Sequence, residues 1–408
     1  MNHSSRHPDW KLICGVQLLT LAAFGAAFAR NAPENTLRLK QLATGQFSEP
    51  NLPIPREKAL KVAPLYDRSD LIGDSDLTAV LKQVRPKFPR EKLKPNHVEH
   101  ALRIWGVDAK FQDPSVLSGE ELKEFLLNHG KYLSSWTPDM PPLLIDEPEG
   151  VAVRWGSEEC ASVHHDHLLA CLSEAGISLN EPVHTPGQTR TMNDLLQLSL
   201  RDLQLDERET EWSALAYALW LPPRDAWRNR EGRHLSFNLL AERLIRGKQT
   251  TGVCLGTHRI YTLVVLLRLD EEHQVLSETT RTAIREHLLK VREELLGSQY
   301  PDGHWESNWP AGSAADLSKS HDELYKQVIG TGHHLEWLAL APREFQLPDD
   351  RLSKAIQWVT KTTIEQPQEK LLERYTFFSH VGGALALWRN TTPSEFWKQA
   401  EKTAPQAQ

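Results

Sequence analysis

Two histidines and a glutamate open a segment of the chain that is otherwise apolar. The segment GTGHHLEWLAL (330–340) places His333, His334 and Glu336 at the head of a run that is apolar enough to be buried. Imidazole and carboxylate groups transfer protons best when their pKa values lie near the operating pH. The combination therefore indicates acid–base chemistry inside the protein.

Histidines occur at the start of other apolar segments as well. They are His97, His100, His164, His165, His167, His258 and His380, and Glu211 takes the same place in a segment without histidine. Each alone could bond to the carbonyls of a neighbouring loop, which is the commoner arrangement. A buried polar group without a partner costs ~1–3 kcal/mol, so the repeated placement favours one shared polar pocket. The predicted catalytic residues are His258, His333, His334, Glu336, His380 and Glu211.

Aromatic and cationic side chains fall near the same segments. Trp212, Trp305 and Trp337 could stack on a sugar ring or an isoprenoid chain, although packing is the commoner role of any single tryptophan. A helix N-terminus attracts anions, and Arg259 could assist it in holding a uronate or phosphate group. The predicted ligand-binding residues are Arg259, Trp337, Trp305 and Trp212.

A second kind of chemistry is indicated by Cys254 and His258, which are four residues apart. If one helix holds both, they lie one turn apart on one face, as paired metal ligands do. His333 or His334, together with His380, could complete a tetrahedral zinc site. A free cysteine in a close-packed core is the commoner arrangement. The prediction therefore assigns no metal ligands or cofactor and keeps zinc as an alternative.

The segments that must position these residues are helices of two kinds. One kind is apolar almost all round and so is expected to be buried on every side. These inner helices are predicted near 97–106, 162–176, 211–221, 256–269, 331–341 and 376–388. The other kind is amphipathic and is often bounded by an N-cap and a terminal glycine. The clearest examples are 118–130, 191–203, 236–247, 281–297 and 349–364.

The spacing of the segments indicates a repeat. His164, Trp212 and His258 follow one another at 48 and 46 residues, and His333 and His380 are 47 residues apart. A period near 47 lies in the range of two-helix repeats. An open solenoid rarely needs one helix of each pair to be apolar on all faces, so closure is favoured. We predict an all-α (α/α)6 toroid of six helical hairpins over residues 90–402.

Two stretches depart from the helical pattern. LLIDEPEGVAVRW (143–155) has two short β-rich runs around a turn and predicts a small β-hairpin insertion. Residues 46–64 contain four prolines. We therefore expect residues 31–89 to form a Pro-rich linker with short helices.

The N-terminus predicts export. Residues 12–29, LICGVQLLTLAAFGAAFA, carry no charge over eighteen residues. Such a run fits an N-terminal membrane anchor, or a signal peptide cleaved after Ala27-Phe28-Ala29, within residues 1–30. Either way the bulk of the protein is expected to be extracytoplasmic. Cys160, Cys171 and Cys254 then form an odd set, which gives no disulfide framework.

Composition excludes several partners. The 408 residues are 40% apolar and 25% charged, as in a globular protein. The net charge is −7, with both signs interspersed and no long basic run. Nucleic acid is therefore not an expected partner, and a small molecule or glycan in the barrel cavity is.

One motif resembles a known superfamily. Gln299, Gly303 and Trp305 in QYPDGHW (299–305) resemble the QW motif of the terpenoid cyclase and protein prenyltransferase α/α toroids, which include squalene cyclase-like enzymes. The resemblance implies the toroid fold. It does not extend to the reaction, because the Asp-X-Asp-Asp proton donor of the cyclases is absent. Gly252 also stands where the prenyltransferase zinc motif has aspartate ahead of Cys254.

Three functions remain as hypotheses from the sequence. The first is an exported toroid that binds or modifies an apolar or isoprenoid ligand. The second is a carbohydrate-active (α/α)6 barrel, a lyase, hydrolase or epimerase that uses the predicted His and Glu residues. The third is a non-catalytic binding module at the cell envelope. The depth and polarity of the barrel interior distinguish them.

Overall fold

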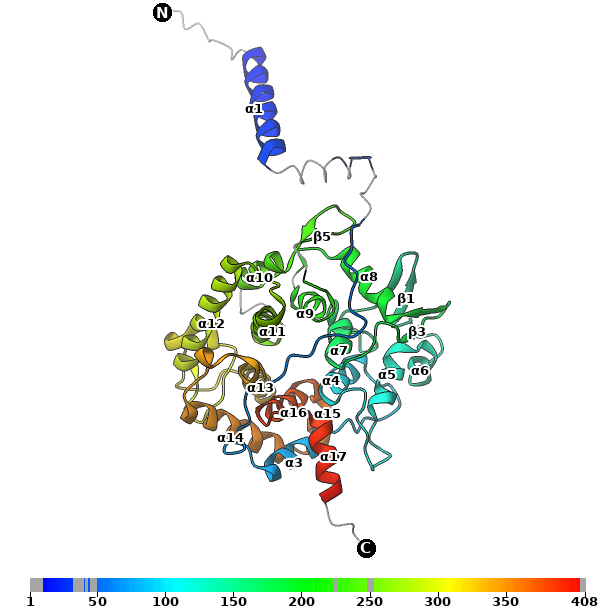
Figure 1. Ribbon diagram of the computed structural model, residues 1–408, viewed down its shortest axis with the longest axis vertical. Helices are drawn as coiled ribbons and strands as arrows, with labels where there is room; N and C mark the ends of the chain where they lie inside the picture. The colour runs from blue at the N-terminus through cyan, green and yellow to red at the C-terminus, as the bar shows by residue number, and fades with distance from the viewer. Residues whose placement is uncertain are drawn as a thin grey trace, which may run out of the picture. The chain divides into compact units, whose positions relative to one another are not determined.

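The computed structural model describes residues 10–31, 40, 43–44, 50–207, 209–223, 226–247 and 253–403. The chain is mostly helical, with small antiparallel hairpins (Figure 1), which agrees with the predicted all-α class. It divides into two compact units. The larger unit comprises Pro53–Asp225 and Ser236–Gln408, and the smaller comprises Met1–Leu52 and Ala226–Leu235.

The smaller unit contains helix α1 (Trp10–Asn31) and the hairpin of β5 (Trp227–Arg228) and β6 (His234–Leu235). Apolar side chains of α1 such as Leu19 and Phe24 are exposed. Among the helices of the described residues, none combines the length and the apolar character that a membrane crossing requires. Signal peptide, anchor and extracytoplasmic location stay predictions.

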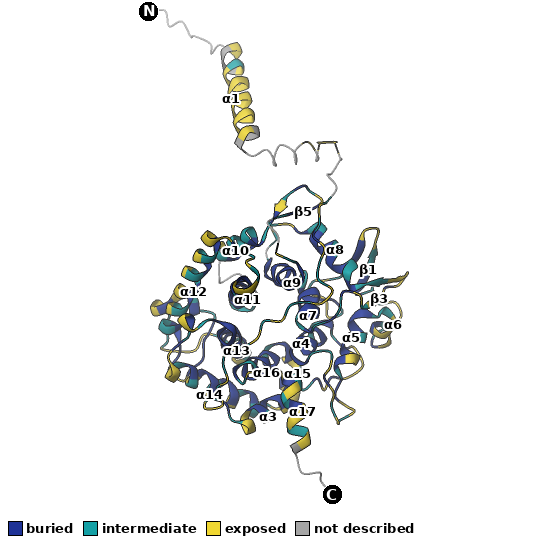
Figure 2. Cartoon of the chain, viewed as in Figure 1, coloured by how far each residue is buried: buried dark blue, intermediate teal, exposed yellow. Residues whose placement is uncertain are grey.

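Six helices of the larger unit pack on one another in a cycle. They are α4 (Pro95–Trp105), α7 (His167–Glu174), α9 (Glu211–Trp220), α11 (Thr257–His273), α13 (Leu324–Leu340) and α16 (Tyr375–Trp388). Each contacts the next in this order, and α16 contacts α4. They are the predicted inner helices, and Figure 2 shows them buried along most of their length because they are apolar on every face.

Amphipathic helices cover this cycle from outside. Among those that contact inner helices are α3 (Asp74–Gln83), α5 (Gly119–Leu127), α10 (Phe237–Arg246), α12 (Glu278–Ser298) and α14 (Asp349–Glu365). Two of them begin at a serine N-cap, as the sequence pattern of this kind of helix predicts. Ser118 forms a capping box with Glu121, and the Ser236 hydroxyl accepts from the backbone N–H of Leu239.

The remaining elements are short or peripheral. They are α6 (His129–Ser134), α8 (Met192–Asp202), α15 (Gln368–Glu373), α17 (Pro393–Thr403), and 3-10 turns at Val253–Gly256, Trp309–Ala314 and Arg343–Phe345. The predicted hairpin insertion is present as β1 (Leu144–Glu147) paired with β2 (Gly150–Val153), on which α8 packs. A second hairpin joins β3 (Pro182–His184) to β4 (Thr189–Thr191).

Several boundaries differ from the predictions. Helix α7 begins at His167, later than residue 162, because Asp166 has a left-handed backbone with φ of 56°. Helix α13 begins at Leu324, earlier than residue 331. The compact unit also begins well before residue 90. Helix α3, placed in the expected linker, packs on α14 and α16 as part of the outer layer.

An extended segment, the strap (residues 56–68), crosses the C-terminal ends of the inner helices. Its backbone N–H groups donate to the last carbonyls of three of them. The bonds run from Arg56 to Trp220 (2.8 Å), Leu60 to Leu219 (2.8 Å), Leu65 to Ala339 (3.2 Å) and Arg68 to Trp388 (2.8 Å). Helix-end carbonyls have no partner within the helix, so the strap satisfies groups that would otherwise need water.

The QW-like motif forms the turn after α12. The indole N–H of Trp305 donates to the Leu295 carbonyl in the last turn of α12 (3.0 Å), and the Gln299 amide donates to Gly303 and to Arg351 of α14 (2.9 and 3.0 Å). Gly303 has φ of 112°, and a Cβ there would collide with the backbone of Lys354. The motif therefore fastens α12 to α14.

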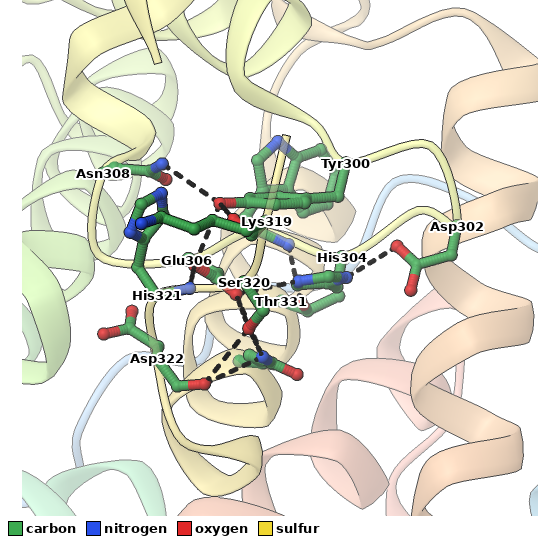
Figure 3. A network of polar contacts seen from close by, with 12 residues as sticks. Tyr300, Asp302, His304, Glu306, Asn308, Lys319, Ser320, His321, Asp322 and Thr331 are labelled. Carbon is green, nitrogen blue, oxygen red and sulfur yellow. Dashed lines mark hydrogen bonds and ion pairs between the residues drawn. The ribbon is translucent and has the colours of Figure 1, made fainter. Parts of the chain in front are cut away.

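A buried carboxylate, Glu306, holds the loop that follows the motif (Figure 3). Its oxygens accept hydrogen bonds from the Ser320 hydroxyl (2.6 Å), the backbone N–H of His321 (2.8 Å), the Gln327 amide (2.9 Å) and the Tyr300 hydroxyl (3.0 Å). We call these five residues the Glu306 network. Every one of these donors fixes part of the loop between α12 and α13.

Candidate functional site

One aromatic side chain from each inner helix lies in a central belt, the aromatic layer. Its members are His100, His167, Trp212, His258, His333 and His380. Successive ring centroids in this order are 4.7, 4.5, 4.1, 4.2 and 3.8 Å apart, and His380 returns to His100 at 5.2 Å. The repeat noticed in the sequence thus brings five imidazoles and one indole together, as expected for helices that run the same way around a ring.

The predicted catalytic residues divide into three places. His258, His333 and His380 meet in the aromatic layer, and Glu336 lies one turn after His333. The other two lie elsewhere. Nδ1 of His334 accepts from the Trp337 indole N–H (3.1 Å), and Glu211 lies 3.7 Å from Arg259, where α9 and α11 begin. His334, Glu211 and Arg259 are therefore not part of the cluster around Glu336.

The predicted ligand-binding tryptophans are buried within the protein. Trp212 belongs to the aromatic layer, the Trp305 indole N–H donates to Leu295, and the Trp337 indole N–H donates to His334. None of the three lines the pocket described next. The structure gives Trp305 and Trp337 the packing role that is commoner for tryptophan, since their N–H groups are satisfied inside the chain.

A pocket of about 320 Å³ lies at the C-terminal ends of the inner helices, next to the strap. The strap contributes residues 60–64, and the aliphatic wall includes Ile104, Leu219, Val265 and Leu387. We expected the ligand mouth at the opposite end, where the inner helices begin. The strap explains the difference, because it forms one wall of a hollow over the last turns of these helices.

Charged side chains form one side of this pocket, the polar floor (Arg103, Glu174, Tyr261 and Glu336). The Arg103 guanidinium lies 2.5 Å from Glu174 and 2.9 Å from Glu336, and the Tyr261 hydroxyl donates to Glu174 at 2.5 Å. The Arg103 side chain is only 2% exposed. A guanidinium held between two carboxylates in the interior is a bidentate, desolvated arrangement of the kind for which arginine is suited.

The polar floor is connected to the aromatic layer through Glu336. Its Oε2 lies 2.9 Å from Nδ1 of His333 and 3.2 Å from Nδ1 of His380. Burial raises the pKa of Glu336, but the Arg103 guanidinium together with His380 and the hydrogen bond from His333 outweighs it, and the pKa falls well below its usual range. Burial lowers the pKa of His333 and of His380. At neutral pH an ionised carboxylate thus faces two neutral imidazoles.

The residues of the polar floor, other than Glu336, were missed in the sequence. Arg103 interrupts the apolar run HALRIW, and Glu174 and Tyr261 likewise lie on inner helices. A charge inside a helix that is buried on every side is a usable signal, because such a charge must find a partner. The pattern of histidines at helix starts does not include these residues.

Two groups of side chains have the composition and spacing of metal sites. One is Cys254, His258 and His333, and the other is His333, Glu336 and His380; in each, the potential ligand atoms lie within 4.8 Å of one another. Among the described residues, neither ring nitrogen of His258 has a hydrogen-bond partner, nor has Nε2 of His333. Burial raises the pKa of the Cys254 thiol and lowers that of His258.

A third arrangement has the connectivity of a nucleophilic triad. The Cys171 sulfur lies 3.5 Å from Nε2 of His167, whose Nδ1 contacts Glu99. All three are buried completely. Burial raises the pKa of Glu99 to about 8 and that of the Cys171 thiol well above its usual range. The thiol is therefore protonated and out of reach of a substrate, which makes this a packed polar contact.

Comparison with known proteins adds no relative to this picture. No family model matches the chain, and no curated protein and no solved structure matches it either. The function of the chain is consequently argued from its own pocket, charges and unpartnered groups.

Proposed function

We propose that the chain is an (α/α)6 toroid that binds a small, mostly apolar molecule beside the strap. The cyclic packing of α4, α7, α9, α11, α13 and α16, with outer helices upon them, supports the toroid. The pocket at the C-terminal ends of these helices supports the binding. Its volume of about 320 Å³ is at the lower end of small-molecule sites, which run roughly from 300 to 1,000 Å³.

A single observation carries the proposal, namely a buried charge cluster under an aliphatic wall. Arg103, Glu174 and Glu336 are held in the polar floor with their charges largely removed from water. Desolvation of an ion costs several kcal/mol, and apolar residues of similar size often pack as stably as a buried ion pair. The cluster is therefore better explained by recognition of the polar group of a ligand than by packing alone.

The charges of the polar floor determine which polar group a ligand can place there. One guanidinium and two carboxylates give a negative balance, and Tyr261 already donates its hydroxyl to Glu174. Such a floor accepts hydrogen bonds from a hydroxyl or an amine and repels a phosphate. Within the isoprenoid class of the first hypothesis, the ligand would be an alcohol or amine rather than a diphosphate.

The wall of the pocket bears on the carbohydrate alternative. It is formed by side chains such as Leu60, Val62, Leu219 and Leu387, and Tyr261 is its one aromatic member among the described residues. Sugar sites are usually built on exposed aromatic faces and dense polar contacts. The lining also includes the polar residues Lys61, Asn390, Thr391, Thr392 and Glu395, but its aliphatic residues fit a hydrocarbon chain, and the buried charges of the floor fit a polar group on that chain. It favours the apolar-ligand hypothesis.

Titration calorimetry on the purified full chain tests the proposal. The probes are farnesol, farnesylamine, farnesyl diphosphate and a hexasaccharide. Farnesol or farnesylamine should bind at least tenfold more tightly than the diphosphate, and the hexasaccharide should not bind. Val62→Trp should weaken the binding at least tenfold because residue 62 lines the pocket. Leu65→Trp, on the same strap but outside the lining, is the matched control and should bind like the wild type.

Two results would overturn the proposal. One is equal binding by the Val62 and Leu65 variants, which would place the ligand elsewhere. The other is binding of the hexasaccharide alone, which would restore the carbohydrate-active hypothesis. A retained melting transition in both variants shows that any loss of binding comes from the pocket.

A further inference from the structure

We propose that Cys254, His258 and His333 bind one zinc ion, on the side of the aromatic layer away from the polar floor. The three residues come from the turn before α11, the first turn of α11 and the middle of α13. Their potential ligand atoms lie within 4.8 Å of one another. This inference is independent of the ligand proposed for the pocket.

His258 is the first argument for the site. Its side chain is 1% exposed, yet neither ring nitrogen has a hydrogen-bond partner among the described residues. Buried imidazoles are normally bonded on at least one nitrogen. Its ring is held between Trp212 and His333, at centroid distances of 4.1 and 4.2 Å, so it cannot turn freely toward another partner. An imidazole with unpartnered nitrogens, beside a thiol and a second imidazole, is arranged as metal ligands are.

His333 supplies the second argument, through its proton. Its Nδ1 lies 2.9 Å from the ionised Glu336 carboxylate and therefore donates, which leaves the lone pair on Nε2. That Nε2 is unpartnered among the described residues. A carboxylate that orients an imidazole in this way is the usual outer partner of a metal-bound histidine. Glu336 thus fixes the tautomer that a metal requires.

The other histidines are not in this ligand set. Nδ1 of His380 lies between the Arg103 guanidinium (3.0 Å) and the Glu336 carboxylate (3.2 Å), and His380 is not among the residues whose ligand atoms gather around Cys254 and His258. Nδ1 of His334 accepts from Trp337, which puts the proton of the neutral ring on Nε2 and leaves no free lone pair. The alternative group of His333, Glu336 and His380 also has the Arg103 guanidinium against it, and that charge repels a cation.

The types of the three ligand atoms indicate which metal the site binds. One sulfur and two imidazole nitrogens suit zinc, which is bound tetrahedrally with Zn–S of ~2.3 Å and Zn–N of ~2.1 Å. Ligand atoms around such an ion are ~3.5 Å apart, so the three side chains close in by about 1 Å or less each. Three protein ligands leave one coordination position, as in zinc sites that bind a water or a substrate.

Metal content of the full chain tests the proposal. After reconstitution with zinc and removal of the excess, the wild type should retain about one zinc per chain, and Cys254→Ser and His258→Gln should each lower the retained zinc at least fivefold. Cys171→Ser is the matched control, because Cys171 is a buried free cysteine outside the cluster. It should retain zinc as the wild type does.

Cobalt gives a second readout that does not depend on retention. The cobalt-loaded wild type and Cys171→Ser should show tetrahedral ligand-field bands and a thiolate-to-metal charge-transfer band, and Cys254→Ser should lose the latter. Far-UV circular dichroism of the metal-free proteins checks that each variant is folded. A wild type that retains no zinc, or a charge-transfer band that survives Cys254→Ser and Cys254→Ala, would overturn the proposal.

Discussion

Glu306 and His258 are equally buried, at 0% and 1% exposure, but their hydrogen bonding is opposite. The Glu306 carboxylate accepts from Tyr300, Ser320, His321 and Gln327. The His258 imidazole has no hydrogen-bond partner among the described residues. A buried polar group that is fully bonded holds structure together, whereas one without partners lowers stability by ~1–3 kcal/mol. Glu306 therefore connects parts of the fold, whereas the nitrogens of His258 are still able to bind a ligand.

Removal of Glu306 should have the largest effect on stability. Glu306→Ala takes away the acceptor that the donors of the Glu306 network share, so that the backbone N–H of His321 loses its acceptor and Tyr300, Ser320 and Gln327 keep only their bonds to neighbouring loop groups. We expect the free energy of unfolding to fall by about 3–5 kcal/mol. Urea unfolding in the presence of a chelator measures it. Glu306→Gln keeps the shape and part of the bonding, so its loss should be smaller. A loss below about 1 kcal/mol for the alanine variant would show that the network is dispensable.

Acid should act on His334 and on Glu306 in different pH ranges. Burial lowers the pKa of His334 to about 3, while the unfolded value is about 6.5. The unfolded chain therefore takes up the proton first, and stability is lost as the pH falls below about 6.5, by about 2 kcal/mol for His334 at pH 5. His334→Gln should remove that part of the pH dependence. Unfolding curves between pH 7.5 and 5 measure the slope, and an unchanged slope would contradict it.

Glu306 belongs to a lower pH range. Although burial raises its pKa, hydrogen bonds from Ser320 and from the backbone of His321 bring it below the ordinary value. Its contribution is therefore complete above the unfolded pKa of about 4.3 and is lost as the pH falls through the lower folded value. Glu306→Gln should leave the pH dependence between 7.5 and 5 as it is in the wild type.

A smaller effect is expected at the edge of the Glu306 network. Ser320 donates to Glu306 and accepts from Gln327, both at 2.6 Å. Ser320→Ala should lower the free energy of unfolding by about 1 kcal/mol, since both bonds are lost but Glu306 keeps its other donors and Gln327 keeps Glu306 and the Asp322 carbonyl as acceptors. Ser318→Ala is the control, because Ser318 bonds only to the exposed Asp316 in the same loop. Equal losses in both variants would mean that loop composition, not the network, sets the effect.

The smallest loss is expected at His258. In a chelator, His258→Leu should not lower the free energy of unfolding and should raise it by up to ~1–3 kcal/mol, because no hydrogen bond from a described residue is broken and an unpartnered polar group is removed. With zinc present, only the wild type should gain stability, since a ligand that binds the folded state stabilises it. A loss above about 2 kcal/mol in the chelator would mean that His258 has a structural partner after all.

Much of the helical arrangement could be predicted because burial on every side leaves a plain mark in the sequence. Segments such as EWSALAYALWL (211–221) and TFFSHVGGALALW (376–388) correspond to α9 and α16. The strap could not be predicted, because it is held by backbone hydrogen bonds that need no particular side chains. The four prolines within residues 46–64, most of them just before the strap, instead indicated a linker. Helix α3 lies within the range that was expected to be a linker, so it was not assigned to the outer layer.

The candidate site could be predicted in part. Histidines at the starts of parallel helices indicated that His258, His333 and His380 would come together, and they do. The location of the pocket and the state of each nitrogen depend on contacts between distant segments. Arg103, for example, contacts Nδ1 of His380 across 277 residues of chain. No local pattern around either residue contains that information.

The way α3 is held has a consequence for biosynthesis. Gln83, at the end of α3, donates to the carbonyl of Ile364, which is 281 residues further on, and Arg389 donates to Ile72 across 317 residues. At ~5–20 residues per second a ribosome needs roughly 15–60 s to bridge such a separation. During that time the apolar inner helices that have already been synthesised are not yet covered by their later neighbours. Nascent chains of this protein should therefore depend on chaperones more than chains whose first helix finds a partner nearby.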